Sequence, residues 1–260
     1  LLFTMLLSLT VFGQSKSKTT EGKDTVLPGF LGGFRFRSIG PAVTSGRIGD
    51  LLVNPKNKSQ WYIAASNGGI WKTDNAGTSF YPIFDGQGSY SIGCLKMDPL
   101  NEHIIWAGSG ENNNQRSVGY GDGVYKSEDG GKSWKNTGLQ NSEHIGGIVI
   151  DPNNSNVVYV AAYGSIRNSG GDRGIYKTND GGKTWRRVLF VSDYTGCFEV
   201  HMDPRNANSL YAVAHQRMRK GYTGVGGGES NTASNLGAGI GVYKEKVSAD
   251  LRFKKIGRAH

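Results

Sequence analysis

Short apolar runs rich in β-branched and aromatic residues alternate with tight-turn sequences along most of the chain. The region from His144 to Phe190 shows this pattern most clearly. Asp-Pro-Asn-Asn at 151–154 and Asp-Gly-Gly at 180–182 separate its apolar runs, which cover 144–150, 157–162, 174–178 and 184–190. Runs of this length and composition, bounded by such turns, predict β-strands. This region is therefore expected to form four short strands.

The same pattern recurs in phase along the chain. Three segments, 70–80, 124–134 and 175–185, are nearly superimposable, with Lys72, Lys126 and Lys177 spaced 54 and 51 residues apart. An Asn/Asp-Pro element keeps the same phase at 53–55, 97–99, 150–152 and 202–204. Repeated four-stranded units of about 50 residues are typical of β-propeller blades, whereas a β-sandwich would not explain the phased repetition.

The sequence thus predicts an all-β fold, a β-propeller of four-stranded blades with about four blades present. Rings usually close with about six to eight blades. We therefore expect an incomplete ring, with the remaining blades of a longer chain as its partners.

Two of the repeated turns resemble Asp boxes, the turns that join the third and fourth strands of a blade. Their residues are Ser127, Asp129, Gly131 and Trp134 in one copy, and Thr178, Asp180, Gly182 and Trp185 in the next. A Ser or Thr hydroxyl and an Asp carboxylate at this spacing can bind turn amides, so the motif is expected to be structural. The first copy has drifted, with Asn75 and Phe80 in place of Asp and Trp, and the fourth, at 242–250, has lost the box.

The two ends of the chain differ in character from the repeats. Residues 1–12 are an apolar run, too short to span a bilayer and typical of a secretory signal peptide, so we expect cleavage near Gly13. The expected organisation is a signal peptide at 1–13, a linker at 14–33, a partial propeller at 34–255, and translated adapter sequence at 256–260. The protein is then expected in the periplasm, on the cell surface or secreted, without a transmembrane segment.

Charge, cysteine content and motifs do not favour nucleic-acid binding, a disulfide scaffold, or a metal or cofactor site. The formal net charge is +9, but the Lys and Arg residues are scattered through turns, with no dense basic run, so nucleic acid is not an expected partner. Cys94 and Cys197 fall on inner strands of non-adjacent blades and are expected to be buried free thiols. No phosphate loop, zinc-ligand spacing or EF-hand loop occurs, so no metal or cofactor is expected.

Candidate ligand-binding residues lie in the connections between the second and third strands, which are long in three of the four units. Long loops on a rigid scaffold are the usual place for binding chemistry, although solvated loops or contacts with another domain would look the same. The candidates in these loops are Glu111, Arg116, Arg167, Asp172 and Arg173.

A second group of candidates comes from aligning the inner strands. Asp50 and Glu199 share one inner-strand position and could supply a carboxylate pair of the kind that glycoside hydrolysis requires. Arg47 and His144 share another position, near the expected channel mouth. Residues at such positions more often bind channel water or neighbouring strands.

From Phe34 to Met218 the chain resembles secreted bacterial propellers of the sortilin-type and xyloglucanase-like glycosyl hydrolase families, notably at 36–41 and 45–48. The sialidase superfamily shares Asp boxes, but 37–39 reads Arg-Ser-Ile rather than its Arg-Ile-Pro. The xyloglucanase resemblance implies a catalytic aspartate after the second strand of the first blade. Asn67 occupies that position, and an amide cannot act as a carboxylate acid or base.

The leading hypothesis is therefore an extracytoplasmic module that binds a peptide, a protein or a glycan. A glycoside hydrolase is the alternative. A third possibility is a purely architectural set of blades that docks another module.

Overall fold

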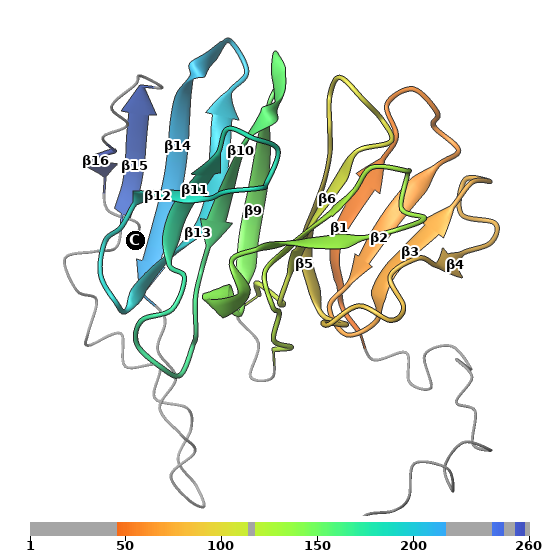
Figure 1. Ribbon diagram of the computed structural model, residues 1–260, viewed down its shortest axis with the longest axis horizontal. Coiled ribbons are helices and arrows are strands. Elements are labelled where there is room, and N and C mark those ends of the chain that lie inside the picture. Colours follow the sequence, from red (N-terminus) through yellow and green to blue (C-terminus); the bar gives the residue numbers. More distant parts are fainter. Residues whose placement is uncertain (1–45, 114–117, 217–240, 247–252, 258–260) are drawn as a thin grey trace, which may run out of the picture. The chain divides into compact units, whose positions relative to one another are not determined.

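The computed structural model describes residues 46–113, 118–216, 241–246 and 253–257. These residues form four antiparallel sheets of four strands each, with strand neighbours in chain order (Figure 1). The first sheet contains β1 (Ile48–Val53), β2 (Trp61–Ala65), β3 (Gly69–Thr73) and β4 (Tyr81–Pro82). The second contains β5 (Ile92–Met97), β6 (Ile105–Ser109), β7 (Val124–Ser127) and β8 (Lys135–Gly138).

The third sheet contains β9 (Ile145–Asp151), β10 (Asn154–Ala162), β11 (Gly174–Thr178) and β12 (Arg186–Leu189). The fourth contains β13 (Thr195–Asp203), β14 (Asn206–Gln216), β15 (Gly241–Lys246) and β16 (Lys254–Gly257). A single 3-10 turn, Gln140–Ser142, precedes β9. The predicted all-β, four-strand blades are confirmed, and each sheet is a meander as in a propeller blade.

Boundaries in the third sheet differ from the expected ones by one to three residues. The last strand begins at Arg186 rather than at 184, because Thr184 and Trp185 belong to the Asp-box turn. The last strand of the fourth sheet includes Ile256 and Gly257, which lie in the segment expected to be adapter sequence. The expected signal peptide and linker lie outside the described residues, as do residues 247–250 of the segment in which the fourth box is lost.

Apolar side chains fill the space between neighbouring sheets, and alternate residues of the second strand of a sheet face opposite sides. Ile105 packs with Tyr62 and Phe84 of the first sheet, whereas the adjacent Trp106 packs with Ile148 of the third. The junction between the third and fourth sheets repeats the arrangement, with Tyr159 and Leu210 in one cluster. Because successive side chains of a strand point to opposite faces of its sheet, each junction between two sheets contains one layer of apolar side chains.

A bulge in each inner strand brings successive inner strands together. The bulge residue is Gly49 in β1, Gly93 in β5, Gly146 in β9 and Phe198 in β13. A Cβ atom at Gly49 would lie 2.8 Å from the carbonyl oxygen of Ile92, and one at Gly93 would lie 2.7 Å from that of Ile145. At these two bulges the inner strands can approach this closely only because the bulge residue is glycine. In β13 the bulge residue is Phe198, which keeps its side chain.

The two intact Asp boxes stabilise their own turns and also contact the preceding sheet. The Ser127 hydroxyl donates to Asp129 Oδ1 at 2.8 Å, and the Ser133 amide donates to the same oxygen at 2.9 Å. The Ser133 hydroxyl donates to the other oxygen, Asp129 Oδ2, and this hydrogen bond is the main reason that the pKa of Asp129 falls to about 2. Trp134 Nε1 donates to the carbonyl of Ile83 in the first sheet at 2.8 Å.

The box in the third sheet has the same geometry. The Thr178 hydroxyl donates to Asp180 Oδ1 at 2.7 Å, and Trp185 Nε1 donates to the carbonyl of Thr137 at 2.9 Å. In the drifted first box, Asn75 Oδ1 still accepts the Ser79 amide at 2.9 Å, but Phe80 has no N–H to donate. The Asp boxes therefore join neighbouring sheets as well as closing turns.

Both cysteines are free and buried, as expected, and burial raises the pKa of each thiol. Cys94 lies in the core between the second and third sheets, and Cys197 in the core between the third and fourth. Within the described part of the chain, no helix has the length and apolar character needed to cross a membrane.

Candidate functional site

The loop at 110–123, which follows β6, contacts the other three sheets. The carboxylate of Glu111 pairs with Arg47, which precedes β1 of the first sheet. Asn112 Nδ2 donates to the carbonyl of Gly146 in the third sheet at 3.0 Å. Val118 packs in a small cluster with Tyr163, Ile166 and Phe198, the last of which lies in the fourth sheet.

This loop therefore lies over the end of the inner strands at which the second-to-third-strand connections emerge. We call this end the loop face. The four residues 114–117, including the candidate Arg116, lie outside the described residues.

The loop face carries an ion pair between the carboxylate of Glu111 and the guanidinium of Arg47. The Glu111 side chain is only 1% exposed, whereas that of Arg47 is 41% exposed. The carboxylate also accepts hydrogen bonds from Asn113 Nδ2 and from the Gly119 amide. Burial alone would raise the pKa of Glu111, but the hydrogen bonds from Arg47, Asn113 and Gly119 outweigh it and hold the pKa below its usual value. The group therefore stays ionised at neutral pH and orients a half-exposed guanidinium.

The Glu111–Arg47 pair predicts a specific pH dependence of stability. The folded-state pKa lies below that of the unfolded chain, so the stabilisation is complete above about pH 4.5 and is lost as the pH falls through the folded-state pKa. Glu111→Gln is expected to cost about 1–2 kcal/mol at pH 7, because one charge-assisted acceptor is lost. The difference between wild type and variant should shrink below pH 4.5 in urea unfolding. An equal difference at all pH values would contradict this assignment.

Asn67 lies beside this pair. The Ser66 amide donates to the carbonyl of Arg47 at 2.8 Å. A Cβ atom at Gly119 would lie 2.7 Å from Asn67 Oδ1 and 2.6 Å from Ser91 Oγ, so the loop backbone passes directly over both side chains. Asn67 is exposed. Arg47, Asn67 and Glu111 thus lie together on the loop face.

His144 is buried and does not line an open mouth. Its ring lies 5.7 Å from that of Tyr120, centroid to centroid. The hydroxyl of Tyr120 accepts a hydrogen bond from Arg167 Nε at 3.3 Å. Tyr120 itself is half-exposed, so this residue and Arg167, rather than His144, face solvent here.

Arg173 and Asp172 both bind backbone groups around the loop of the third sheet. Arg173 is fully buried, and its guanidinium donates to four backbone carbonyls, those of Tyr163, Ser165, Asn168 and Gly170. Asp172 Oδ2 accepts the Asn141 amide at 3.1 Å. Arg173 therefore holds the loop in place with a group that a ligand cannot reach without displacing the loop, whereas Asp172 is only partly buried.

The two inner-strand acids bind different partners. The carboxylate of Asp50 accepts the amides of Leu51 and Leu95, each at 2.8 Å, and so links β1 to β5. Glu199 Oε2 lies 3.1 Å from His201 Nε2, on the fourth sheet, with both side chains exposed. The geometry thus assigns Asp50 to the backbone of two neighbouring inner strands.

Val118 and three exposed tyrosines of the loop face were not predicted as site residues. Val118 packs in a cluster with side chains of the third and fourth sheets, and Tyr90, Tyr120 and Tyr194 are 65%, 49% and 49% exposed. The sequence held a signal for two of them, since Tyr90 and Tyr120 stand in glycine-rich connections.

Comparisons with known proteins agree with this architecture. The family described as Sortilin-Vps10 (sortilin, neurotensin receptor 3) matches residues 122–235. A protein of Paenibacillus sp described as a xyloglucanase is 23% identical over 170 residues, which is 60% of this chain and 16% of the relative.

Among solved structures, the GH74 enzyme of Niastella koreensis superimposes with a TM-score of 0.57 at 19% identity, covering 81% of this chain and 30% of that chain. The GH74 xyloglucanase of Xanthomonas campestris gives a TM-score of 0.52 at 15% identity, covering 80% and 30%. The predicted resemblance to sortilin-type and xyloglucanase-like propellers is confirmed. The structural likeness concerns the fold, and the chain spans less than a third of each of these relatives.

Proposed function

We propose that this chain belongs to an exported recognition propeller that binds a peptide, a protein or a glycan at the loop face. The observation that carries the proposal is the Glu111–Arg47 pair, in which a buried carboxylate orients a half-exposed guanidinium. A guanidinium held in this way presents its positive charge in a fixed orientation to a polar ligand. The exposed tyrosines of the loop face offer apolar faces to a sugar ring or a peptide side chain.

The proposed export rests on residues 1–13. An apolar run of this length, followed at once by polar residues, fits a secretory signal peptide. A periplasmic, surface-attached or secreted location would give a binding propeller access to extracellular ligands.

Glycoside hydrolysis is the second candidate, favoured by the similarity to a xyloglucanase. Two observations weigh against this chain's supplying the catalytic acids. Asn67 stands where the resemblance implies an aspartate, and both oxygens of Asp50 accept backbone amides. Any hydrolytic carboxylates would then come from other parts of a longer protein.

The test is binding and cleavage of defined probes by the wild-type chain. Calorimetry with xyloglucan oligosaccharides, cellohexaose and a peptide pool would be combined with an assay for released reducing ends. We expect binding without release, and an affinity about tenfold weaker in Arg47→Gln, because a charged donor is lost. The control is Arg205→Gln, which removes an exposed arginine at the opposite strand ends and should leave affinity unchanged.

Two outcomes would overturn the proposal. Release of reducing ends that disappears in Asp50→Asn would establish the hydrolase instead. Equal weakening in Arg47→Gln and Arg205→Gln would show that only overall charge matters.

A further inference from the structure

A cavity of about 550 Å³ lies between the second and third sheets, at the strand ends that carry the Asp boxes. These are the ends opposite the loop face. We call it the inter-box cavity; its lining residues come from β7, the turn before β8, β8 itself, β10 and the box of the third sheet. The residues that matter for its chemistry are Lys126, Lys135 and Lys183, the acids Glu128 and Asp180, and Trp134.

Three lysines converge on the inter-box cavity. Lys126 lies with its Nζ 5.3 Å from the ring centroid of Trp106 and 3.5 Å from the carbonyl oxygen of Gly181 in the next sheet. Lys135 is paired with Lys126 across β7 and β8, and is exposed. Lys183 is exposed in the box of the third sheet. The cavity thus has cations on two of its walls.

Placing two lysines directly opposite each other in an antiparallel pair is unfavourable without a counter-charge. The arrangement nevertheless recurs. Lys177 faces Arg186 in the third sheet, and Lys244 faces Lys254 in the fourth. In the inter-box cavity Glu128 supplies one counter-charge, because it pairs with Lys126 and also attracts Lys135. One carboxylate therefore serves two lysines, and an anionic ligand would supply a further counter-charge.

The two acids that line the inter-box cavity already have partners. Asp180 accepts the hydroxyl groups of Thr178 and Thr184 and the amides of Lys183 and Thr184, and these hydrogen bonds lower its pKa. Glu128 lies 2.7 Å from Lys126 Nζ. Lys135 and Lys183 are therefore the charged groups most available to a ligand.

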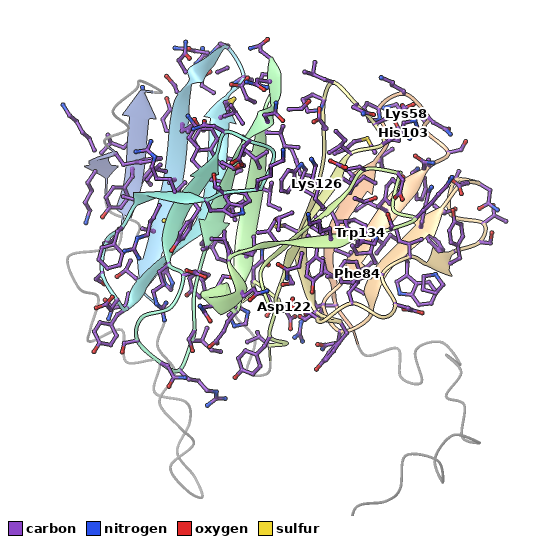
Figure 2. All side chains as sticks on the ribbon, in the orientation of Figure 1. Lys58, Phe84, His103, Asp122, Lys126 and Trp134 are labelled. Carbon is purple, nitrogen blue, oxygen red and sulfur yellow. The ribbon has the colours of Figure 1, made fainter. Side chains whose placement is uncertain are left out.

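Trp134 gives the inter-box cavity a partly exposed aromatic wall. Its Nε1 is committed to the carbonyl of Ile83, and its ring packs edge-on against Phe84 at 5.2 Å, so the orientation of the indole is set by the first sheet. Figure 2 labels Lys126, Trp134 and Phe84 on the ribbon. Exposed Ser133 and Asn156 add hydrogen-bonding groups at the rim. An aromatic ring beside hydroxyl and amide groups suits a sugar.

We propose that the inter-box cavity binds a carboxylated glycan, such as a polymer of uronic acids. Carboxylates would pair with Lys135 and Lys183, and a sugar ring would pack against Trp134. A nucleic acid fits less well, because its affinity depends on neutralising several evenly spaced phosphates along a groove. This site is separate from the loop face and does not depend on the function proposed there.

The equivalent junction between the first and second sheets lacks this combination. Tyr81 takes the place of Lys135, and its hydroxyl donates to Asp74 Oδ2 at 2.5 Å. Asp74 also lies 3.6 Å from Lys72 Nζ. This junction therefore has two lysines instead of three, namely Lys72, beside which Asp74 lies, and Lys132, which occupies the place of Lys183. It provides an internal control for the proposal.

The experiment measures retention of the full chain in affinity electrophoresis on polygalacturonic acid, with neutral xyloglucan and single-stranded DNA as comparison probes. The test variant is the double substitution Lys135→Ala/Lys183→Ala. Its control is Lys58→Ala/Lys132→Ala, which removes the same charge from exposed positions elsewhere. Circular dichroism of all variants verifies folding. We expect the test variant to bind polygalacturonic acid at least about tenfold more weakly, and the control to stay within about twofold of wild type.

Three results would overturn the proposal. Equal weakening in both double variants would show a non-specific charge effect. Stronger retention on DNA than on polygalacturonic acid would assign the cavity to a nucleic acid. Binding to neutral xyloglucan alone would show that the lysines do not bind the ligand. Arg47→Gln should bind polygalacturonic acid as wild type does, so failure at the loop face and failure at the inter-box cavity are distinguishable.

Discussion

Replacing Arg173 with methionine is expected to lower the free energy of unfolding by about 3 kcal/mol or more. The guanidinium is fully buried and donates to the carbonyls of Gly170, Tyr163 and Asn168 at 2.9, 2.8 and 2.7 Å, and also to that of Ser165. Methionine approximates the length of the side chain but offers no donor, so four carbonyls lose their partner together. Urea unfolding, with the midpoint and slope compared with wild type, measures the loss.

The matched control is Arg167→Met in the same loop. Arg167 donates through Nε to the Tyr120 hydroxyl in an exposed hydrogen bond of 3.3 Å. Its removal is expected to change stability by no more than about 0.5 kcal/mol. Similar losses in the two variants would mean that the loop tolerates unpaired carbonyls, and that Arg173 is not what holds it.

The second large effect is expected for Gly146→Ala, at the bulge of β9. A Cβ atom there would overlap the carbonyl of Phe198 in β13, and it would lie 2.7 Å from the carbonyl carbon. The clash is with backbone, which cannot rotate away, so the third and fourth sheets must separate. We expect a loss of about 2–3 kcal/mol, in the range of overpacked cores, measured by thermal or urea unfolding.

The adjacent residue gives the control. A Cβ atom at Gly147 would have as its nearest neighbour the amide nitrogen of Val200 at 3.5 Å, an ordinary contact. Gly147→Ala is expected to be neutral or slightly stabilising, since it reduces the freedom of the unfolded chain. If both alanines destabilise equally, the close approach of the inner strands is not the cause.

The strands and the Asp-box turns could be predicted because their chemistry is local. In the box at 178–185, a threonine hydroxyl and an aspartate bind amides no more than four residues away. Repetition of such turns in phase with apolar runs indicates the blade and its length. The expected strands of the third unit therefore match β9 to β12 within a few residues.

The roles of the candidate site residues could not be predicted from the local sequence. Arg173 and Arg167 stand in one loop and have the same side chain, yet one is buried among carbonyls and the other is exposed. Asp50 binds the amide of Leu95, 45 residues away, in a different sheet. Nothing in the local sequence distinguishes a side chain that binds backbone from one that faces a ligand.

By itself, the sequence determined the all-β repeat and the places of the strands and turns. Each of these follows from residue type and spacing over a few residues. Only the tertiary structure decided that Glu111 would orient Arg47, and that Lys135 and Lys183 would share the inter-box cavity. The physical reason is that both arrangements depend on how closely successive sheets pack, and bulge glycines and the apolar layers between sheets set that distance.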